Sequence, residues 1–534
     1  MPHGRYGGSL IADAQQVSLT IEGRQFNVPA GTSILEAAKT VGVLIPHYCY
    51  HPGLSIVGNC RMCQVEVEKM PKLAPACQTA VAEGQVVHVY ADRALTARKA
   101  VLEFLLINHP LDCPICDKSG ECELQDYTYR EGRAVGRLQD PKRFNPAEDF
   151  GGDVQYVTNR CILCTRCVRF MDEVAQDTVL NVSERGDRAV IGKFEGKDLT
   201  HPWAANIIDL CPVGALLSKD FLNKSRAWEL DRTASVCPNC TQGCNTILET
   251  RDNMVVRMRP RSNLDVNHYY LCDEGRLDYR WMNRTDRLEA PLVRRGDRLA
   301  ATAWDDALRA AALHLNGKRA FVLASPMLSN ESLWVLSRIM KHGGGAGGFR
   351  VRREPEAPLP GVPDLARRAE RAANVRAAEL FGFVKSDTPL AGMQEGDVLI
   401  VADHEVAAAD APALAKASAV IVIGTTMPEL VSNAMVALPS TNVAEEDGTF
   451  TNLRGRVQQY RQARAAPGMS RPVWWSGGDL LVFLGERAGY YIASEAFAAL
   501  AAQQPEFAGM SYDSLGFRGQ VLAGQPVAAG GAAR

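Results

Sequence analysis

The residues in this sequence with the clearest chemical potential are its cysteines. All fifteen lie between Cys49 and Cys272, and the rest of the 534-residue chain has none. An odd count in a long chain argues against a disulfide framework, which is typical of small secreted proteins. The cysteines fall into close groups, and grouped thiolates are the ligands that iron-sulfur clusters and zinc prefer. We therefore expect metal ligation in the N-terminal half.

The first group is a set of four: Cys49, Cys60, Cys63 and Cys77. Four thiolates suit a 2Fe-2S cluster, which needs two cysteines at each iron. The gap of ten residues after Cys49 differs from the plant-type ferredoxin pattern, whose first gap is four. A zinc ion with four thiolate ligands is the alternative for this set.

The second group has only three cysteines, and a histidine precedes them: His109, Cys113, Cys116 and Cys122. His109 directly follows a predicted helix over 95–107. Imidazole can replace a thiolate at iron, and the exchange raises the potential because imidazole is neutral. Asp112 and Asp117 are the alternatives to His109 as fourth ligand, although carboxylates are harder ligands. After the helix, we expect the chain to be irregular up to about residue 150.

The third group combines a close run with a distant Cys-Pro: Cys161, Cys164, Cys167 and Cys211. This is the ferredoxin spacing for a 4Fe-4S cluster, with the closing cysteine supplied from far along the chain. The same spacing counted back from Cys211 leads to His201, which we interpret as the remnant of a lost second cluster. A fourth group can hold another 4Fe-4S cluster or a structural zinc ion: Cys237, Cys240, Cys244 and Cys272.

The elements that must position these residues differ between the two halves of the chain. Alternating apolar and polar residues over 16–30 predict a hairpin, and a helix begins after it with a capping hydroxyl. Two more strands complete a small mixed sheet. Beyond residue 285, short apolar strands beginning at 320, 398 and 419 alternate with alanine-rich helical stretches, which indicates a parallel α/β sheet.

Composition and charge exclude several classes of protein. The formal net charge is -2, so the chain lacks the basic field of a nucleic-acid binder. Seven arginines between 350 and 376 have almost no aromatic neighbours, and we expect a solvated helix and loop there. Apolar runs are too short to cross a bilayer, and residues 1–8 lack the apolar stretch of a secretion signal. We expect no membrane span and a cytoplasmic location.

The motifs, in their order, resemble the large iron-sulfur subunit of bacterial respiratory complex I, the family of NADH-quinone oxidoreductase G subunits. The resemblance rests on GNCRMCQVE (58–66), NHPLDCPICDKSGECELQD (108–126), NRCILCTRCVR (159–169) and DLCPVGA (209–215). It covers residues 16–285. The block EEDGTFTNLRGRVQ (445–458) resembles a segment of molybdopterin oxidoreductases, to which the C-terminal half of that subunit is related.

The resemblance implies a multidomain α+β and then α/β fold. We expect a β-grasp 2Fe-2S ferredoxin-like domain over 1–93, a His-plus-three-Cys cluster domain over 94–150 and a 4Fe-4S ferredoxin-like domain over 151–225. A four-cysteine 4Fe-4S domain over 226–285 and a shortened molybdopterin-oxidoreductase-like domain over 286–534 follow. The four sets would hold one 2Fe-2S and three 4Fe-4S clusters, with the Cys237 cluster in a structural role.

The resemblance also implies a function, which is electron relay within a proton-translocating NADH-quinone oxidoreductase. Single electrons would pass from a flavin-bearing, NADH-binding partner toward quinone, which the chain would reach only through other peripheral-arm subunits. The chain would lie on the cytoplasmic side of the bacterial inner membrane and carry no complete active site. Arg61, Thr165 and Arg166 are candidate hydrogen-bond donors to cluster sulfur.

Three alternatives remain open at this stage. A formate dehydrogenase subunit would need a full pterin domain with a metal ligand, and no cysteine follows Cys272. A hydrogenase-type subunit would need further cysteines, and all fifteen are assigned. A zinc-bound structural scaffold would keep the thiolates without redox chemistry. Gly343, Gly345 and Gly348 match GxGxxG but follow a predicted helix, so we expect a flexible loop without a nucleotide.

Overall fold

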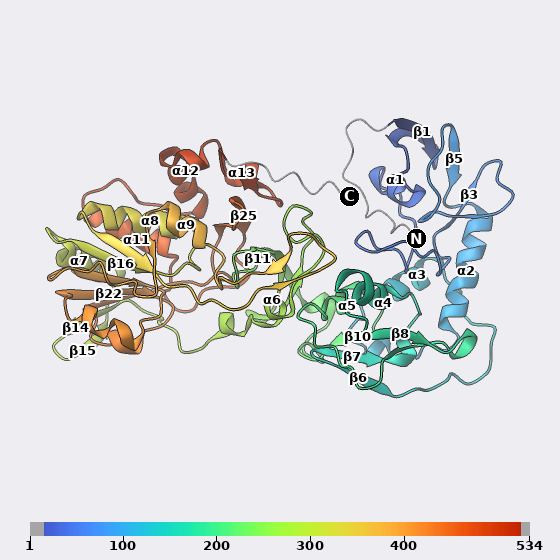
Figure 1. Cartoon of the computed structure of the whole chain (residues 1–534), viewed down its shortest axis with the longest axis horizontal. Coiled ribbons are helices and arrows are strands. Elements are labelled where there is room, and N and C mark those ends of the chain that lie inside the picture. The colour runs from blue at the N-terminus through green and yellow to red at the C-terminus, as the bar shows by residue number, and fades with distance from the viewer. Residues whose placement is uncertain (1–14, 525–534) are drawn as a thin grey trace. The chain divides into compact units, whose positions relative to one another are not determined.

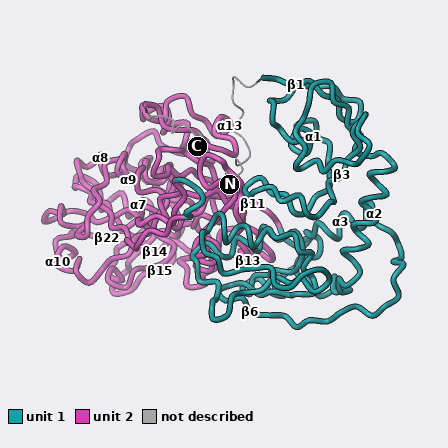
Figure 2. Tube along the Cα trace, turned by 45° about the vertical axis from the view of Figure 1, so that its right-hand side comes forward, with its two compact units in different colours: residues 1–230, 359–363, 531–534 teal, residues 231–358, 364–530 magenta. Residues whose placement is uncertain are grey.

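The computed structural model describes residues 15–524 and divides them into two compact units (Figure 1 and Figure 2). The first unit runs to Leu230 and includes the short segment Leu359–Pro363. The second unit comprises Asp231–Pro358 and the residues from Asp364 onward. The expected domain ends at residues 1 and 534, and the stretch 1–8, lie outside the described residues. The finer division into five domains stays a prediction.

The first unit opens with a five-stranded mixed sheet of order β2-β1-β5-β3-β4. β1 and β2 form the antiparallel hairpin, and β1 pairs with β5 in parallel. Helix α1 begins at a cap, because the Ser33 hydroxyl accepts a hydrogen bond from the Glu36 amide at 3.2 Å. The helix buries its apolar residues in the core of this sheet. The bounds are β1 (Gln16–Ile21), β2 (Arg24–Pro29), α1 (Ile34–Thr40), β3 (Gln64–Val67), β4 (Ala74–Pro75) and β5 (Gln85–His88).

The rest of the first unit consists of the long helix α2 and of short elements joined by loops. A three-stranded sheet of order β10-β7-β6 and a two-stranded sheet of β8 and β9 lie among them. The bounds are α2 (Asp92–Leu106), α3 (Glu123–Glu131), β6 (Ala147–Gly151), β7 (Val154–Val157), α4 (Arg166–Arg169), η3 (Phe170–Val174), β8 (Leu180–Ser183), β9 (Val190–Lys193), α5 (Asn206–Leu210) and β10 (Leu216–Ser218).

The expectation that the chain is irregular from the end of α2 to about residue 150 is wrong. The structure places α3 and β6 within this segment. Helix α3 buries only Leu124 and Tyr127, so its apolar pattern is too sparse to be recognised in the sequence. β6 contains a single buried residue, Phe150, and it forms by pairing with β7. Tertiary partners rather than local pattern therefore specify both elements.

The second unit is built on an eight-stranded sheet of order β15-β14-β23-β22-β21-β16-β17-β20. The strands from β23 to β20 are parallel, and the β14–β15 hairpin joins them in the antiparallel sense. The bounds are β14 (Leu292–Arg295), β15 (Arg298–Ala301), α7 (Trp304–Leu315), β16 (Ala320–Ala324), α8 (Asn330–His342), β17 (Ala346–Phe349), α9 (Val375–Leu380), β20 (Val384–Lys385), β21 (Val398–Ala402), α10 (Ala411–Leu414), β22 (Ala419–Gly424), β23 (Val436–Pro439), α11 (Val473–Phe483) and α12 (Ala493–Gln503).

Three smaller sheets complete the second unit. β11, β12 and β13 form an antiparallel sheet that carries the last cysteine set, and β18 pairs with β19. The block 445–458 forms most of the β24–β25 hairpin, to which β26 adds. The bounds are β11 (Asp231–Val236), β12 (Asn245–Arg251), β13 (Met254–Pro260), α6 (Asp273–Leu277), β18 (Ala357–Pro358), β19 (Ala366–Arg367), β24 (Gly448–Thr451), β25 (Arg456–Tyr460), α13 (Tyr512–Leu515) and β26 (Gln520–Val521).

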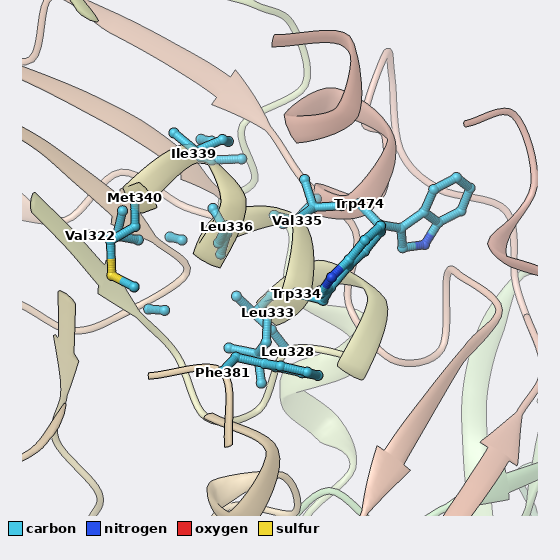
Figure 3. Packing of buried hydrophobic residues seen from close by; sticks show 14 of the residues in the cluster. Val322, Leu328, Leu333, Trp334, Val335, Leu336, Ile339, Met340, Phe381 and Trp474 are labelled. Carbon is cyan, nitrogen blue, oxygen red and sulfur yellow. The ribbon is translucent and has the colours of Figure 1, made fainter. Parts of the chain in front are cut away.

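Alternating residues of the central strands feed two separate cores. Successive side chains of a strand point to opposite faces of the sheet, and in β16 Val322 joins one cluster while Phe321 and Leu323 join the other. The larger cluster contains α8, whose Leu333 and Trp334 pack with side chains of neighbouring elements (Figure 3). Burial on both faces explains why the strands are continuous apolar runs.

The loop expected at the GxGxxG pattern is wrong for the second half of the pattern, since only Gly343 to Gly345 lie outside regular structure. Gly347 and Gly348 lie in β17, which pairs with β16 and β20. A Cβ at Gly345 would overlap the carbonyl of Ala320, and a Cβ at Gly347 would stand 2.7 Å from the carbonyl oxygen of Val322. These glycines are therefore present because neighbouring backbone approaches too closely for a side chain.

Candidate metal centres

The first cysteine set lies on loops beside the five-stranded sheet. Cys63 directly precedes β3 and Cys77 follows β4, while Cys49 and Cys60 belong to the loop after α1. The thiols of Cys49 and Cys60, of Cys49 and Cys77, and of Cys63 and Cys77 interact with one another. The interactions with Cys60 and Cys77 lower the pKa of the Cys49 thiol to about 2. All four sulfur atoms are therefore close enough to share one small cluster.

His109, the histidine before the second set, has a nitrogen atom free to ligate. Its Nδ1 is buried and has no hydrogen-bond partner among residues 15–524. Burial, together with the charges of Arg160 and Lys142, lowers the pKa of the ring to about 4. The imidazole is thus held neutral, which is the form that binds metal.

The two aspartates considered as alternatives to His109 are engaged elsewhere. Asp112 forms an ion pair with Arg160 at 2.8 Å. Asp117 accepts a hydrogen bond from the backbone amide of Asn223 at 3.0 Å. These contacts favour His109 over either carboxylate as the fourth ligand.

One cysteine of the second set, Cys116, lies against a position with no room for another side chain. Cys116 and Cys122 are buried and Cys113 is exposed. A Cβ added at Gly214 would overlap the sulfur of Cys116, so only glycine fits there. The backbone at Gly214 therefore packs directly against the Cys116 sulfur, although the two residues lie far apart in the sequence.

The third set lines one small cavity. The loop that carries Cys161, Cys164 and Cys167 turns tightly, with left-handed backbone at Leu163 (φ 53°) and Thr165 (φ 59°). Cys211 reaches the same cavity from the end of α5. The remaining lining includes the apolar residues Ile162, Ile191, Val213, Ala215 and Leu216.

Burial makes the third set a poor place for bare thiolates. It raises the pKa of Cys164 to about 12 and that of Cys161 to about 11. Four thiolates in such surroundings need a positively charged group between them, which iron supplies. The donor set and its apolar walls therefore fit a buried iron-sulfur cluster.

The fourth set belongs to the second unit and is fully buried. Cys237 directly follows β11, and Cys240 and Cys244 precede β12. Cys272 is the N-terminal cap of helix α6. A Cβ at Gly275 would stand 3.2 Å from the Cys272 sulfur and 3.4 Å from the Cys237 sulfur. These contacts bring Cys272 beside Cys237 although 35 residues separate them in the sequence. Within the described chain, no three His, Cys, Asp or Glu side chains converge on a single-ion position.

Of the candidate donors to sulfur, only one has the burial that the role needs. Arg61 is exposed, and the Thr165 hydroxyl accepts a hydrogen bond from Arg169 at 3.3 Å. Arg166 is buried, at 4% exposure, and donates to the carbonyl oxygens of Tyr50 and Leu210. Sequence reasoning missed Arg169, which is equally well placed, because its contacts lie more than a hundred residues away.

The first three sets are linked by direct contacts within the first unit. The rings of Tyr48, beside Cys49, and Tyr127, on the helix that follows Cys122, have their centroids 5.4 Å apart. The backbone amide of Glu123 donates to the carbonyl oxygen of Pro212 at 3.0 Å. Loops from different sets thus pack against one another.

Comparison with protein families assigns a domain to each set. A 2Fe-2S iron-sulfur cluster binding domain matches residues 14–91, and the NADH-ubiquinone oxidoreductase-G iron-sulfur binding region matches 98–136. The ferredoxin-like domain of NADH-quinone oxidoreductase subunit 3 matches 151–217. The molybdopterin oxidoreductase Fe4S4 domain matches 230–284, and molybdopterin oxidoreductase matches 365–481. This order confirms the expected fold class.

Curated relatives agree with these matches. The 78 kDa subunit of the mitochondrial NADH-ubiquinone oxidoreductase of Candida albicans is 44% identical over 57% of this chain and 42% of its own length. The G subunit of the NADH-quinone oxidoreductase of Rickettsia bellii is 38% identical over 61% of this chain and 48% of its own length. The chain is a homologue of the NADH-quinone oxidoreductase G subunit.

This G-subunit homologue spans about half the length of the curated relatives it matches. The 75 kDa subunit of the NADH-ubiquinone oxidoreductase of Reclinomonas americana is 36% identical. The match spans 72% of this chain and 55% of the length of that subunit. A chain of the NAD+-reducing NiFe-hydrogenase in its H2-reduced state is 27% identical, with a TM-score of 0.34, over 39% of this chain and 90% of its own. No helix within residues 15–524 has both the length and the apolar character needed to cross a bilayer.

Proposed function

We propose that the chain is the iron-sulfur electron-transfer subunit of an NADH-quinone oxidoreductase. One observation carries the proposal: every cysteine falls into one of four groups, and each group lies in a segment that matches an iron-sulfur domain. Electrons would pass singly along the chain, as part of a larger complex that couples the reaction to proton translocation.

We assign one 2Fe-2S cluster to the first set and one 4Fe-4S cluster to each of the others. Bound clusters would accept and release single electrons. The protein would ligate each cluster, bury it and fix its orientation, and the apolar walls of the site would exclude water from the sulfur atoms. The ligands are Cys49, Cys60, Cys63 and Cys77; His109, Cys113, Cys116 and Cys122; Cys161, Cys164, Cys167 and Cys211; and Cys237, Cys240, Cys244 and Cys272.

The second unit is proposed to hold no molybdopterin. A cavity of about 710 Å³ lies at the carboxyl ends of β16, β21 and β22, the edge where open parallel sheets bind ligands. Its four arginines are already in ion pairs with carboxylates, and six acidic side chains also line it. Molybdopterin carries phosphate, and this lining offers it no uncompensated positive charge. The residues therefore do not fit that cofactor.

The proposed partners are a flavin-bearing, NADH-binding subunit and other peripheral-arm subunits, with quinone reached only through them. We propose a peripheral position on the cytoplasmic side of the bacterial inner membrane. Similarity to subunits of NADH oxidoreductases supports a place for the chain in a complex of this kind.

Anaerobic purification followed by metal and sulfide counting tests the proposal. We expect roughly fourteen irons and as many acid-labile sulfides per chain, from one 2Fe-2S and three 4Fe-4S centres, and no molybdenum. Electron paramagnetic resonance of the reduced protein should then resolve separate signals. Colourless protein with zinc and without iron would instead establish the structural scaffold, and a stoichiometric molybdenum content would favour a formate dehydrogenase-type subunit.

A further inference from the structure

Three buried arginines alternate with the cysteines of the third set. Arg160, Arg166 and Arg169 are 7%, 4% and 8% exposed. Arginine stays charged at any accessible pH, so each brings a full positive charge into the interior. Burying a charge is costly unless an opposite charge compensates it. The partner of each arginine therefore indicates the role of its charge.

Arg169 joins the backbones of two different cysteine sets. Its Nη2 donates to the carbonyl oxygen of Cys49 at 2.6 Å and to that of Cys164 at 3.3 Å. Its Nη1 donates to the carbonyl oxygen of Ser55, and its Nε to the hydroxyl of Thr165. A single guanidinium group thus fixes the Cys49 loop of the first set against the Cys164 loop of the third.

The charges of the three arginines are compensated to different degrees. Arg160 has Asp112 at 2.8 Å, and Arg166 has Glu123 at 3.6 Å. No carboxylate of the described chain lies within 4.0 Å of Arg169, whose acceptors are all neutral oxygens. The nearby Glu173 carboxylate accepts hydrogen bonds from the amide and hydroxyl of Ser55 instead.

The cysteines supply the negative charge that Arg169 lacks. The hydrogen bonds from Arg169 to the carbonyl oxygens of Cys49 and Cys164 place its guanidinium beside cysteines of both sets. A cluster with four thiolate ligands is an anion and gains a further negative charge on reduction. An uncompensated cation fixed beside two such sites favours their reduced states.

We propose that Arg169 is a positioning residue that holds the first and third metal centres together and raises the reduction potential of both. The inference rests on the proposed function, since it requires iron-sulfur clusters at these sets. Arg169 is not itself a ligand, yet it would set the potential of both centres and join loops that lie more than a hundred residues apart in the sequence.

The test is a redox titration of the anaerobically purified full chain, followed by electron paramagnetic resonance after iron and sulfide counting. Arg169→Gln removes the charge, and Arg169→Lys keeps it. Arg98→Gln is the matched control, because Arg98 is fully buried and also donates to carbonyl oxygens but has its charge compensated by Glu131 at 3.0 Å.

We expect Arg169→Gln to lower the ratio of reduced to oxidised first and third centres at fixed potential by at least about tenfold, or about 59 mV for one electron. The second and fourth centres should keep their potentials, Arg169→Lys should stay within about threefold of the native ratio, and Arg98→Gln should change none of the four. Iron lost only from the first and third sets in Arg169→Gln, and restored in Arg169→Lys, would also support the inference.

Unchanged potentials in an iron-replete Arg169→Gln protein would overturn the inference, as would equal shifts of all four centres or an equal shift in Arg98→Gln. Iron lost from all four sets in both Arg169 variants would overturn it too. These outcomes leave the proposed function standing. Native protein without iron would overturn the proposed function itself, and the two failures are therefore distinguishable.

Discussion

The two units bury charge in different ways. In the first unit, Arg169 is buried among carbonyl oxygens and keeps its charge. In the second, Arg287 and Glu445 form a buried ion pair at 2.8 Å, and Arg371 pairs with Glu274 close to the fourth cysteine set. The Arg169 charge beside the first and third sets thus has no carboxylate of residues 15–524 within 4.0 Å, whereas the Arg371 charge beside the fourth set is neutralised by Glu274.

The units also differ in what holds them together. The first unit has short elements, and its cysteine loops are joined by side-chain to backbone hydrogen bonds. The second has a continuous sheet, with β21 and β22 buried along their whole length between two apolar clusters. Apolar burial contributes about 25 cal/mol for each Å² removed from water. The second unit therefore has a source of stability that does not depend on metal.

Removal of iron should cause the largest difference in hydrogen exchange between the two units. After treatment with an oxidant and a chelator, we expect amide hydrogen exchange in α3 and α4 to accelerate by at least about a hundredfold, because ligation and folding are coupled. Exchange in β21 and β22 should remain slow. Mass spectrometry of the exchanged protein measures both, and equal acceleration in the two units would contradict the comparison.

Two glycines beside cysteine sulfur provide the next test. A methyl group at Gly214 would overlap Cys116 Sγ, whereas one at Gly275 would meet its nearest atoms at 3.2 Å. We expect Gly214→Ala to lose about four of the roughly fourteen irons and Gly275→Ala to retain them all. Iron counting on the two purified variants checks this, and full iron in Gly214→Ala would show that the loop around the second set can move.

The smallest effect concerns pH and the second unit. Burial raises the pKa of Glu331 to about 7 and that of Glu446 to about 8. Raised carboxyl pKa values mean that the folded state holds protons more tightly than the unfolded state, whose value is near 4.5. The stability from these protons is complete below about pH 4.5 and is lost as the pH rises through 7 to 8.

Between pH 5 and pH 8.5 we expect the free energy of unfolding of the second unit to fall, because the unfolded state releases these two protons at a lower pH than the folded state does. Urea denaturation, followed by hydrogen exchange in β16 and β21, measures it. Glu446→Gln should flatten the dependence, while Glu395→Gln, at an exposed position, should leave it unchanged. A pH dependence that is the same in Glu446→Gln as in the native chain would disprove the assignment.

Much of the architecture could be predicted because its signals are local. The hairpin at 16–30, the apolar strands at 320, 398 and 419 and the order of the cysteine sets follow from patterns a few residues long. The errors share one cause. α3, β6 and β17 have weak or misleading local patterns, and each depends on a partner from elsewhere in the chain.

By itself the sequence determined how the cysteines are grouped, because cysteines with only two or three residues between them must lie close together whatever the fold. Only the tertiary structure decided what surrounds them. It brings Cys211 into the cavity of Cys161, sets Gly214 against Cys116 and places the Arg169 charge between two sets without a carboxylate. Burial and charge compensation depend on contacts between residues far apart in the sequence, such as Arg169 with Cys49, and no local pattern encodes them.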